Sequence, residues 1–289
     1  MPAVPAFPPG QSATARGTLR YEDCAQDGRL IPIAVPPALG PLWVSVMGKH
    51  EALRQGMQRG VIPILTRLTI QAHEQPVRVD RPTEIRGGFV LAHDRDGDEV
   101  SRLYMNAWAE VWGGSGRIGP GGGDGPLAHA ATMFAEHTLT RLFAPPDQRR
   151  VTRLDIDGVP PIPEPRYAAP AVTTAGDAPD GARWSDELSP DSVLTPFTLD
   201  QTDGNQHVNS LVYIRVFLDA VQRRLAERGQ PLVRASRVID IAYRKPCFAG
   251  DQVRSHVRLF EAAGGLGAAG HITGTDGKPR CYVRVLFGA

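Results

Sequence analysis

Hydrophobic residues in the last third of the chain recur first at helical and then at strand spacing. Ile214, Phe217, Leu218, Val221 and Leu225 follow a period of three to four residues, and Gly229 ends the run. This pattern predicts an amphipathic helix with a C-terminal glycine. The segments 236–244, 251–261 and 280–288 then alternate and are rich in β-branched residues, with a "TDGK" turn before the last. They predict an antiparallel meander.

The first half of the chain shows a weaker version of the same pattern. A helical pattern runs from Leu42 to about Gly60, and alternating segments follow at 65–72, 83–94 and 102–113. We expect an additional helix near 126–143, in which His129 and His137 could share a face. A surface or lid helix is favoured there over a metal site, because no third metal-binding side chain stands at helical spacing.

The two halves of the sequence resemble each other. A constant shift of 176 pairs Tyr21 with Phe197, Asp27 with Asp203 and Gly28 with Gly204. In each half the order is strand, Asp-Gly turn, one long helix and antiparallel strands. A sheet that wraps around one helix buries its inner face, which is the hotdog arrangement. We therefore predict an α+β protein with a tandem (double) hotdog fold: two antiparallel sheets, each wrapped around one long helix, forming a pseudo-dimer. Two unrelated α+β domains are the alternative.

Three segments rich in glycine and proline suggest the domain boundaries. Residues 1–13 are expected to form a tail, 113–126 a loop, and 159–195 a Pro/Gly-rich linker. The expected N-terminal hotdog domain is 14–158, with a degenerate site and the extra helix. The C-terminal hotdog domain, 196–289, is expected to carry the site.

Composition narrows the class of protein. The 32 basic and 31 acidic residues nearly cancel, so no nucleic-acid partner is expected. The chain lacks a membrane-length apolar run and its start lacks the features of a secretory signal, so we expect a soluble, cytoplasmic protein without a membrane span. Cys24, Cys247 and Cys281 lie far apart without a CxxC pair, which argues against disulfides and against a zinc site.

The segment "DGNQHVNSLVYI", 203–214, concentrates groups that bind or move protons immediately before the C-terminal helix. We expect the helix to begin near Val208. The N–H groups at its start could stabilise negative charge that develops on a carbonyl oxygen. A histidine within hydrogen-bond reach can take a proton from water or from a thiol, because imidazole titrates near neutrality.

This segment, followed by "IDIAYRKPCFAGDQV" at 239–253, resembles the acyl-acyl carrier protein (acyl-ACP) thioesterases of the double hotdog thioesterase group. The first-half segment "LTRLTIQAHEQPVRVDRPTEI", 65–85, also resembles that family, and the similarity covers about 19–286. The resemblance implies catalytic roles for Asp203, Asn205, His207 and Cys247, with no metal and no other cofactor. One departure is Pro246, which stands where the family has a glutamate before the cysteine.

The residue roles leave alternatives open. Either Cys247 is a nucleophile with His207 as its base, or water attacks directly with Asp203 or His207 as base; the second is favoured, because a lone strand cysteine is commonly a buried small hydrophobe. Asp203 could instead only hold a turn and Asn205 only cap the helix, and His207 could be a core histidine.

Candidates for substrate contact are Val208, Asn209 and Tyr213, although Asn209 could instead support the loop and Tyr213 could be core. The first half has Arg29, Ile31 and Ile33 where the second has Asn205, His207 and Asn209, so we expect one active site per chain. The first half would then supply the wall of an acyl pocket, for which Trp43, Met47, Leu53 and Met57 are candidates, with core packing as the alternative explanation of these residues.

We therefore expect a thioesterase that hydrolyses acyl-ACP or acyl-CoA to free acid and thiol. An acyltransferase or dehydratase on the same fold is the first alternative, and a non-catalytic acyl-binding protein is the second. The expected partner is an acyl carrier protein or a coenzyme A thioester. The expected assembly is a monomeric pseudo-dimer or a homodimer of it.

Overall fold

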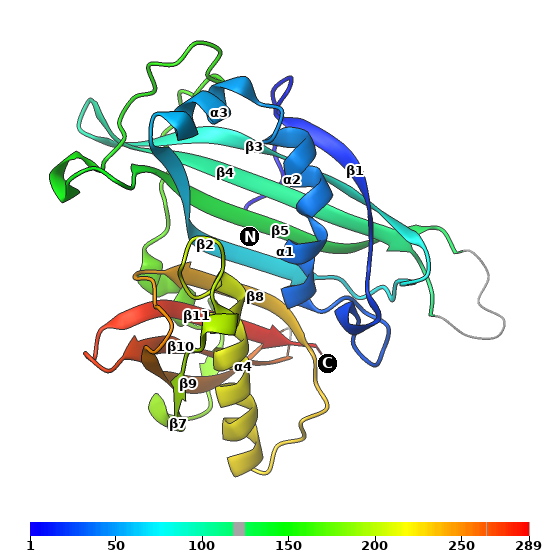
Figure 1. Ribbon diagram of the computed structural model, residues 1–289. Helices are drawn as coiled ribbons and strands as arrows, with labels where there is room; N and C mark the ends of the chain where they lie inside the picture. Colours follow the sequence, from blue (N-terminus) through cyan, green and yellow to red (C-terminus); the bar gives the residue numbers. More distant parts are fainter. Residues whose placement is uncertain (118–124, 264, 289) are drawn as a thin grey trace. The chain divides into compact units, whose positions relative to one another are not determined.

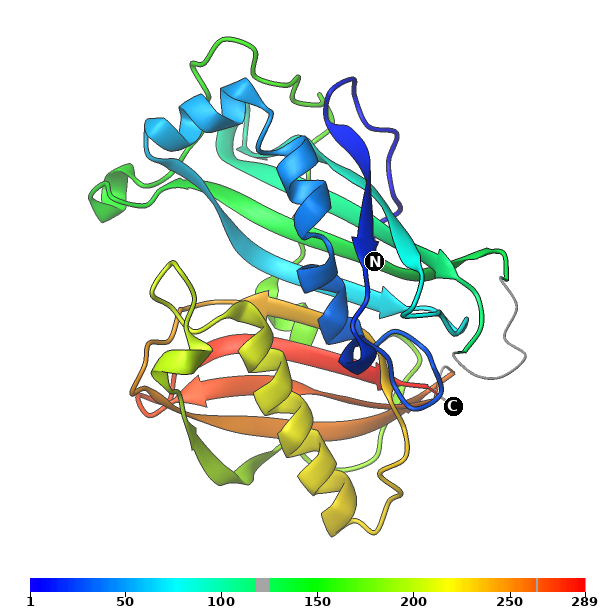
Figure 2. The same ribbon diagram turned by 45° about the vertical axis from the view of Figure 1, so that its right-hand side comes forward.

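The computed structural model describes residues 1–117, 125–263 and 265–288. The chain divides into two compact units, Met1–Ala169 and Pro170–Ala289. Each unit contains one antiparallel sheet with helical segments across one of its faces (Figures 1 and 2). We describe each unit by itself.

The C-terminal unit places one straight helix, α4 (Ser210–Glu227), across its sheet (Figure 2). The strands pair antiparallel in the order β8-β11-β10-β9, and both β6 and β7 pair with β9. Strands and short 3-10 helices of this unit are η4 (Val172–Gly176), β6 (Arg183–Trp184), β7 (Ser189–Pro196), η5 (Leu199–Gln201), β8 (Ser236–Tyr243), β9 (Gln252–Ala262), β10 (Gly265–Gly274) and β11 (Pro279–Phe287).

Helix α4 forms as its sequence predicts. The predicted apolar positions Ile214, Phe217, Val221 and Leu225 are all buried, because this face of the helix packs against the sheet. Gly229, just beyond the helix, has a φ of 64°. This left-handed conformation is the one that glycine adopts most readily when it ends a helix.

The N-terminal unit has a five-stranded antiparallel sheet in the order β1-β3-β4-β5-β2. Three helical segments follow one another across one face of this sheet (Figure 1). The elements are β1 (Ser12–Thr18), η1 (Tyr21–Asp23), η2 (Pro32–Ala34), α1 (Val35–Ala38), α2 (Gly40–Val46), α3 (Glu51–Gln58), β2 (Val61–Ala72), β3 (Pro82–Asp96), β4 (Glu99–Gly114), β5 (Leu127–Arg141) and η3 (Pro146–Gln148).

The two units share one strand order. In each sheet the order starts with the strand that precedes the helical segments. The second, third and fourth strands after those segments come next, and the first strand after them comes last. This order is β1-β3-β4-β5-β2 in one unit and β7-β9-β10-β11-β8 in the other. The predicted fold of two hotdog repeats is therefore confirmed, and the alternative of two unrelated domains is wrong.

The additional helix expected near 126–143 is wrong. Residues Leu127–Arg141 form β5, which pairs with β4 on one side and with β2 on the other. The ladders satisfy the backbone on both sides, and this tertiary context overrides the local helical preference. His129 stacks on Trp112, whereas the Nδ1 atom of His137 bonds the Met105 carbonyl oxygen, so the two histidines have different surroundings.

The single long helix expected from Leu42 to about Gly60 is also wrong in the N-terminal unit. Helix α2 ends at Val46 and α3 begins at Glu51. Between them, a Cβ on Gly48 would lie 2.8 Å from the Val44 carbonyl oxygen, so the chain passes too close to itself for a larger residue. Gly60, with a φ of 77°, follows α3.

The segment 159–195, expected to be a linker, contains structure. Strand β6 and most of β7 lie inside it and pair with β9, and the two units meet between residues 169 and 170. Pro190 and Pro196 are compatible with β7, because proline is tolerated on a strand at the edge of a sheet. Part of the loop expected at 113–126, residues 118–124, lies outside the described residues.

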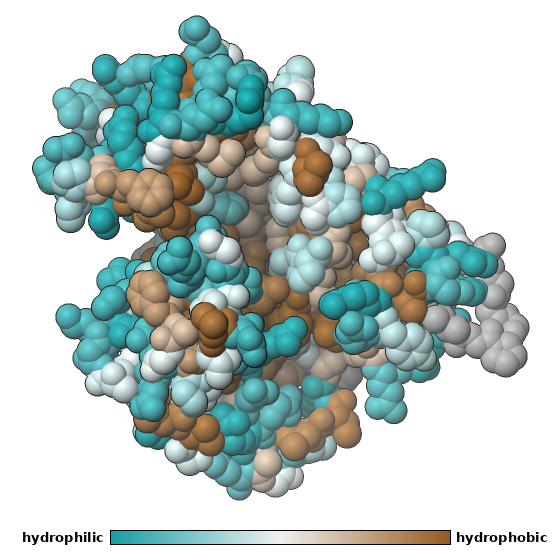
Figure 3. Space-filling model, viewed as in Figure 1, coloured by the Kyte–Doolittle hydropathy of each residue, from teal (hydrophilic) through white to brown (hydrophobic). Residues whose placement is uncertain are grey.

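Hydrophilic residues predominate on the face shown in Figure 3, and hydrophobic residues form small separate groups there. Scattered exposed hydrophobic residues are ordinary for a folded protein. Within the described residues, none of the helices has the length and apolar character needed to span a bilayer.

Candidate active site

The segment 203–209 forms a tight loop in front of α4. The Asp203 N–H donates to the His207 carbonyl oxygen (3.0 Å), and the Gln206 N–H donates to the Asp203 carbonyl oxygen (2.9 Å). The Asp203 carboxylate accepts the Asn205 N–H (2.9 Å) and lies 3.4 Å from the Asn209 side-chain nitrogen. Asp203 therefore holds the turn.

Asn209 caps α4. Its side-chain oxygen accepts the Leu211 N–H at 3.0 Å, and its carbonyl oxygen accepts the Val212 N–H. The helix begins at Ser210, so the start expected near Val208 lies two residues too early. Because the cap uses the Leu211 and Val212 N–H groups, those groups are not free to bind a substrate oxygen.

Cys247 fixes the loop through its backbone. The Val208 N–H donates to the Cys247 carbonyl oxygen (2.8 Å), and the Cys247 N–H donates to the Tyr213 hydroxyl oxygen (2.8 Å). Val208, Tyr213 and Cys247 are all buried. These bonds attach the loop to the segment that follows β8, and the Tyr213 hydroxyl attaches that segment to α4.

Burial also controls the chemistry of the Cys247 side chain. It raises the pKa of the thiol, and the neighbouring Tyr213 hydroxyl and Arg280 guanidinium only partly oppose that rise. Burial, followed by the contact with Cys247, likewise raises the pKa of Tyr213, so its phenol stays protonated. A protonated thiol is a weak nucleophile, which disfavours Cys247 as the attacking group.

His207 and Asn205 are the accessible members of the motif. The His207 ring is half-buried and meets the Phe248 ring edge to face, with 5.2 Å between centroids. Within residues 1–117, 125–263 and 265–288 its imidazole makes no hydrogen bond, and Asn205 is exposed. Both side chains can therefore receive a water molecule or a substrate.

The structure brings the motif together only in part. Asn205 and Asn209 each contact the Asp203 carboxylate, and Cys247 contacts Val208 and Tyr213. Asp203 does not bond the His207 side chain within the described residues, so it does not orient the imidazole there. The same part of the chain contains no group of three or more His, Cys, Asp or Glu side chains that could hold a metal ion.

The N-terminal unit repeats the turn without the histidine. The Arg29 N–H donates to the Asp27 carboxylate at 3.0 Å, as the Asn205 N–H does to Asp203. Gly28 adopts a φ of 83° in this turn. The following residues, Ile31 among them, have no side chain that transfers protons, which leaves the turn as the shared feature of the two halves.

The N-terminal unit contains an apolar pocket between its helices and its sheet. The pocket holds about 690 Å³ of empty space, open mouth included. Met47, a candidate for the acyl wall, lines this pocket, whereas the half-buried Trp43, also a candidate, is not among its lining residues. The other lining residues come from α3, from the strands and from the segment after η3; they include Leu53, Gly56, Met57, Leu91, Met105, Leu139, Leu154, Ile156 and Pro160.

Sequence reasoning missed two residues beside the loop. Phe248 packs on His207, and Arg280 is a buried cation on β11 that lowers the pKa of Cys247. Phe248 could have been suspected because it follows Cys247 directly. Arg280 had no such signal, since strand pairing alone brings it to the chain after β8: its carbonyl oxygen accepts the Arg244 N–H at 2.8 Å.

Residues 194–288 match the protein-family model described as "Acyl-ACP thioesterase C-terminal domain". The C-terminal unit belongs to the acyl-ACP thioesterase family. This match confirms the resemblance inferred from the sequence, and it covers the loop, α4 and the strands of this thioesterase domain from β8 to β11. No curated protein sequence matches the chain.

Solved thioesterases share the fold over nearly the whole chain. A 12:0-ACP thioesterase from Umbellularia californica is 13% identical, with a TM-score of 0.56 and 96% of each chain covered. An acyl-ACP thioesterase from Bacteroides thetaiotaomicron is 14% identical, with a TM-score of 0.57, covering 96% of this chain and 97% of that one. A putative oleoyl thioesterase from Lactobacillus plantarum is 17% identical, with a TM-score of 0.55, covering 96% and 95%.

Proposed function

We propose that the protein hydrolyses an acyl thioester, acyl-ACP or acyl-CoA, to the free acid and the thiol, and that His207 is the base. The observation that carries this proposal is the accessible His207 imidazole on a loop held by Asp203, Asn209 and the Cys247 backbone. The family of the thioesterase domain supports the same reaction. A rigid loop matters because a general base acts only when it is held within hydrogen-bond reach of the proton it takes.

In the proposed reaction, His207 takes a proton from a water molecule while the water oxygen attacks the thioester carbonyl carbon. The tetrahedral intermediate then collapses, the carbon–sulfur bond breaks, and the imidazolium returns the proton to the departing thiolate. Asn205, exposed on the same loop, can bind the attacking water or the carbonyl oxygen through its amide.

Direct attack by water fits the structure better than a covalent route through Cys247. The thiol is fully buried and its pKa is raised by that burial. Pro246, in place of the glutamate that the family has there, provides no carboxylate, which favours a base on the 203–207 loop. Attack by water with His207 as base requires no thiolate.

We further propose that the apolar pocket of the N-terminal unit binds the alkyl part of the acyl group. Its lining is almost entirely apolar, as is typical of sites that bind hydrophobic groups. Alkyl chains gain about 0.8 kcal/mol for each buried methylene group, so a pocket of fixed depth favours the longest chain that fits. The role proposed for Met47 follows from its place in this lining.

Release of free thiol tests the proposed reaction. The whole chain is incubated with acyl-CoA and acyl-ACP of graded chain length, and the acyl products are separated. We expect thiol release with an equimolar free acid and a clear optimum of chain length. Dehydrated or transferred acyl products, or tight acyl binding without thiol release, would overturn hydrolysis. The ratio of kcat/KM values for the two substrates decides between the carriers.

The state of the cysteines bears on the compartment in which the protein acts. All three cysteines are free, and two of them are buried. Reduced cysteines of this kind are typical of reducing compartments, and we therefore propose the cytoplasm as the site of action. A monomer or a homodimer of the tandem repeat stays a prediction.

A further inference from the structure

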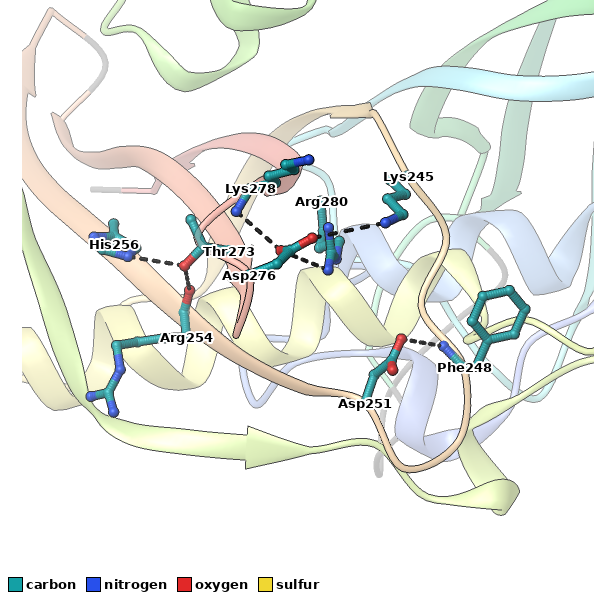
Figure 4. A network of polar contacts seen from close by, with 9 residues as sticks. All are labelled: Lys245, Phe248, Asp251, Arg254, His256, Thr273, Asp276, Lys278 and Arg280. Carbon is teal, nitrogen blue, oxygen red and sulfur yellow. Dashed lines mark hydrogen bonds and ion pairs between the residues drawn. The ribbon is translucent and has the colours of Figure 1, made fainter. Parts of the chain in front are cut away.

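A group of cations surrounds one carboxylate beside the active-site loop. Asp276, in the turn between β10 and β11, accepts the Lys278 N–H (3.1 Å) and a guanidinium N–H of Arg280 (2.9 Å), and it lies 3.8 Å from the Lys245 ammonium group (Figure 4). Two cationic side chains and the backbone N–H of Lys278 thus share one carboxylate. We call Lys245, Asp276, Lys278 and Arg280 the turn cluster.

The turn cluster has a surplus of positive charge. The hydrogen bond from the Lys278 backbone N–H, together with Arg280, keeps the pKa of Asp276 low, so its negative charge is present at neutral pH. Lys245 and Arg280 together leave one formal positive charge after this carboxylate is counted, and the exposed side chain of Lys278 adds a further cation to the same turn. Arg244, exposed next to Lys245, adds to the same sign.

Arg280 also has unused hydrogen-bond donors. The residue is 8% exposed, and its Nε and Nη1 atoms are buried without a hydrogen-bond partner among the described residues. A buried guanidinium that is only partly paired is a fixed positive charge in a region of low dielectric constant. The field of this charge acts on the space beside the exposed ammonium groups of Lys245 and Lys278.

The turn cluster lies close in sequence to a residue that bonds the active-site loop. Lys245 lies two residues before Cys247, whose carbonyl oxygen bonds the Val208 N–H next to His207. Arg280 itself lowers the pKa of Cys247, so its guanidinium lies close to that residue. Any group bound at Lys245 and Lys278 is therefore bound at the margin of the site.

We propose that the turn cluster binds the phosphate of the phosphopantetheine arm that carries the acyl group. This inference rests on the proposed function and names the part of the substrate that the cluster recognises. Lys245 and Lys278 contact the phosphate, whose negative charge complements the positive surplus of the cluster. Arg280 supplies the fixed charge beneath them. The same phosphate occurs in carrier-bound phosphopantetheine and in coenzyme A.

A binding experiment isolates the phosphate from the rest of the arm. Binding of 4′-phosphopantetheine and of pantetheine, which lacks the phosphate, is measured by NMR titration of the full chain. The proteins are the wild type, a Lys245→Gln/Lys278→Gln double variant, and Arg234→Gln as a control that removes an exposed cation outside the cluster. All three changes are at the surface, and thermal unfolding checks that the variants fold.

We expect the double variant to weaken binding of 4′-phosphopantetheine roughly tenfold and to leave pantetheine unchanged, because charge-assisted contacts to phosphate are lost. Arg234→Gln should bind both like the wild type. Equal weakening for both ligands, no weakening for either, or no preference of the wild type for the phosphorylated arm would each overturn the proposal. None of these readouts needs turnover, so they stay decisive even if the chain hydrolyses no thioester.

The source of the phosphate is tested separately by kinetics of the same variants. A higher KM with both acyl-ACP and acyl-CoA supports a shared phosphopantetheine site. A higher KM with acyl-CoA alone would assign the cluster to the nucleotide phosphates and overturn the inference.

Discussion

At the scale of residues, the structure separates the polar side chains of the 203–209 loop into two groups. Asp203 and Asn209 use their oxygens within the loop and at the helix start, whereas Asn205 and His207 remain accessible. The sequence could not make this division, because aspartate and asparagine are equally good at turns and at helix caps. The cap is Asn209, and the role of a cap considered for Asn205 does not apply.

Replacement of the cap tests this division. Asn209→Ala removes the acceptor of the Leu211 N–H and the contact with Asp203, so we expect a loss of about 1 kcal/mol in the free energy of unfolding. Asn205→Ala is the matched control, because the Asn205 side chain is exposed; it should change that free energy by less than about 0.5 kcal/mol. Urea unfolding measures both. Equal losses in the two variants would contradict the assignment of the cap.

His137 makes a second prediction at this scale. Burial lowers its pKa from the ordinary 6.5 to about 4. The unfolded chain therefore binds a proton that the folded chain does not take up, and stability is lost as the pH falls from about 6.5 towards 4. Above 6.5 the contribution is fully present.

The size of this effect is on the order of 2 to 3 kcal/mol. It is measured as the difference in unfolding free energy between pH 7 and pH 4.5, in the wild type and in His137→Gln. The variant should lose less stability than the wild type over this interval. An equal loss in both proteins would show that His137 does not titrate in the expected way.

At the scale of elements, the success of prediction followed the strength of the local pattern. Helix α4 has apolar residues at a regular helical period and a terminal glycine, and the structure agrees with it closely. Strand β5 was wrongly predicted to be a helix because "LAHAATMFAEH" consists largely of good helix formers. Only pairing with β2 and β4, which are distant in sequence, makes it a strand. Strand β7 was hidden in the same way by its prolines.

The break between α2 and α3 is the element that distinguishes the two repeats. Helix α4 is continuous over Ser210–Glu227, whereas α2 and α3 are separated by Met47–His50. The apolar pocket lies beside this break. Met47 and Gly48 line it at the break itself, and Gly56 lines it from α3. The weak helical pattern in the sequence thus corresponds to a broken helix beside an apolar pocket.

Filling this pocket from α3 should shorten the preferred acyl chain. A Cβ on Gly56 would lie 3.5 Å from the Ile156 side chain, an ordinary contact, so Gly56→Leu can project into the pocket. We expect kcat/KM to fall at least about tenfold for the longest accepted acyl chain and to change little for the shortest. Gly40→Leu, at an exposed helical glycine with open space around it, is the control. A uniform fall for all chain lengths would contradict the proposed acyl site.

At the scale of the whole chain, the sequence revealed two repeats because both keep the Asp-Gly turn, the helical segment and the following strands. It also predicts that the reactive residues lie in one repeat, since only the second has a histidine in this loop. The burial of Cys247 agrees with the interpretation of it as a small hydrophobe, whereas the presence of Arg280 beside it could not be predicted, because it depends on how strands β8 and β11 pair. The pairing of segments that are distant in sequence is the feature that is hardest to predict from a single sequence.

The central claim is that one accessible histidine activates water while the nearby cysteine serves the structure. Steady-state hydrolysis by His207→Gln and by Cys247→Ser tests it most directly, with far-UV circular dichroism to confirm folding. The account predicts that His207→Gln lowers kcat by at least about a hundredfold. It predicts that Cys247→Ser stays within about tenfold of the wild type, since the backbone bonds to Val208 and Tyr213 remain. Loss of activity in Cys247→Ser together with full activity in His207→Gln would contradict it.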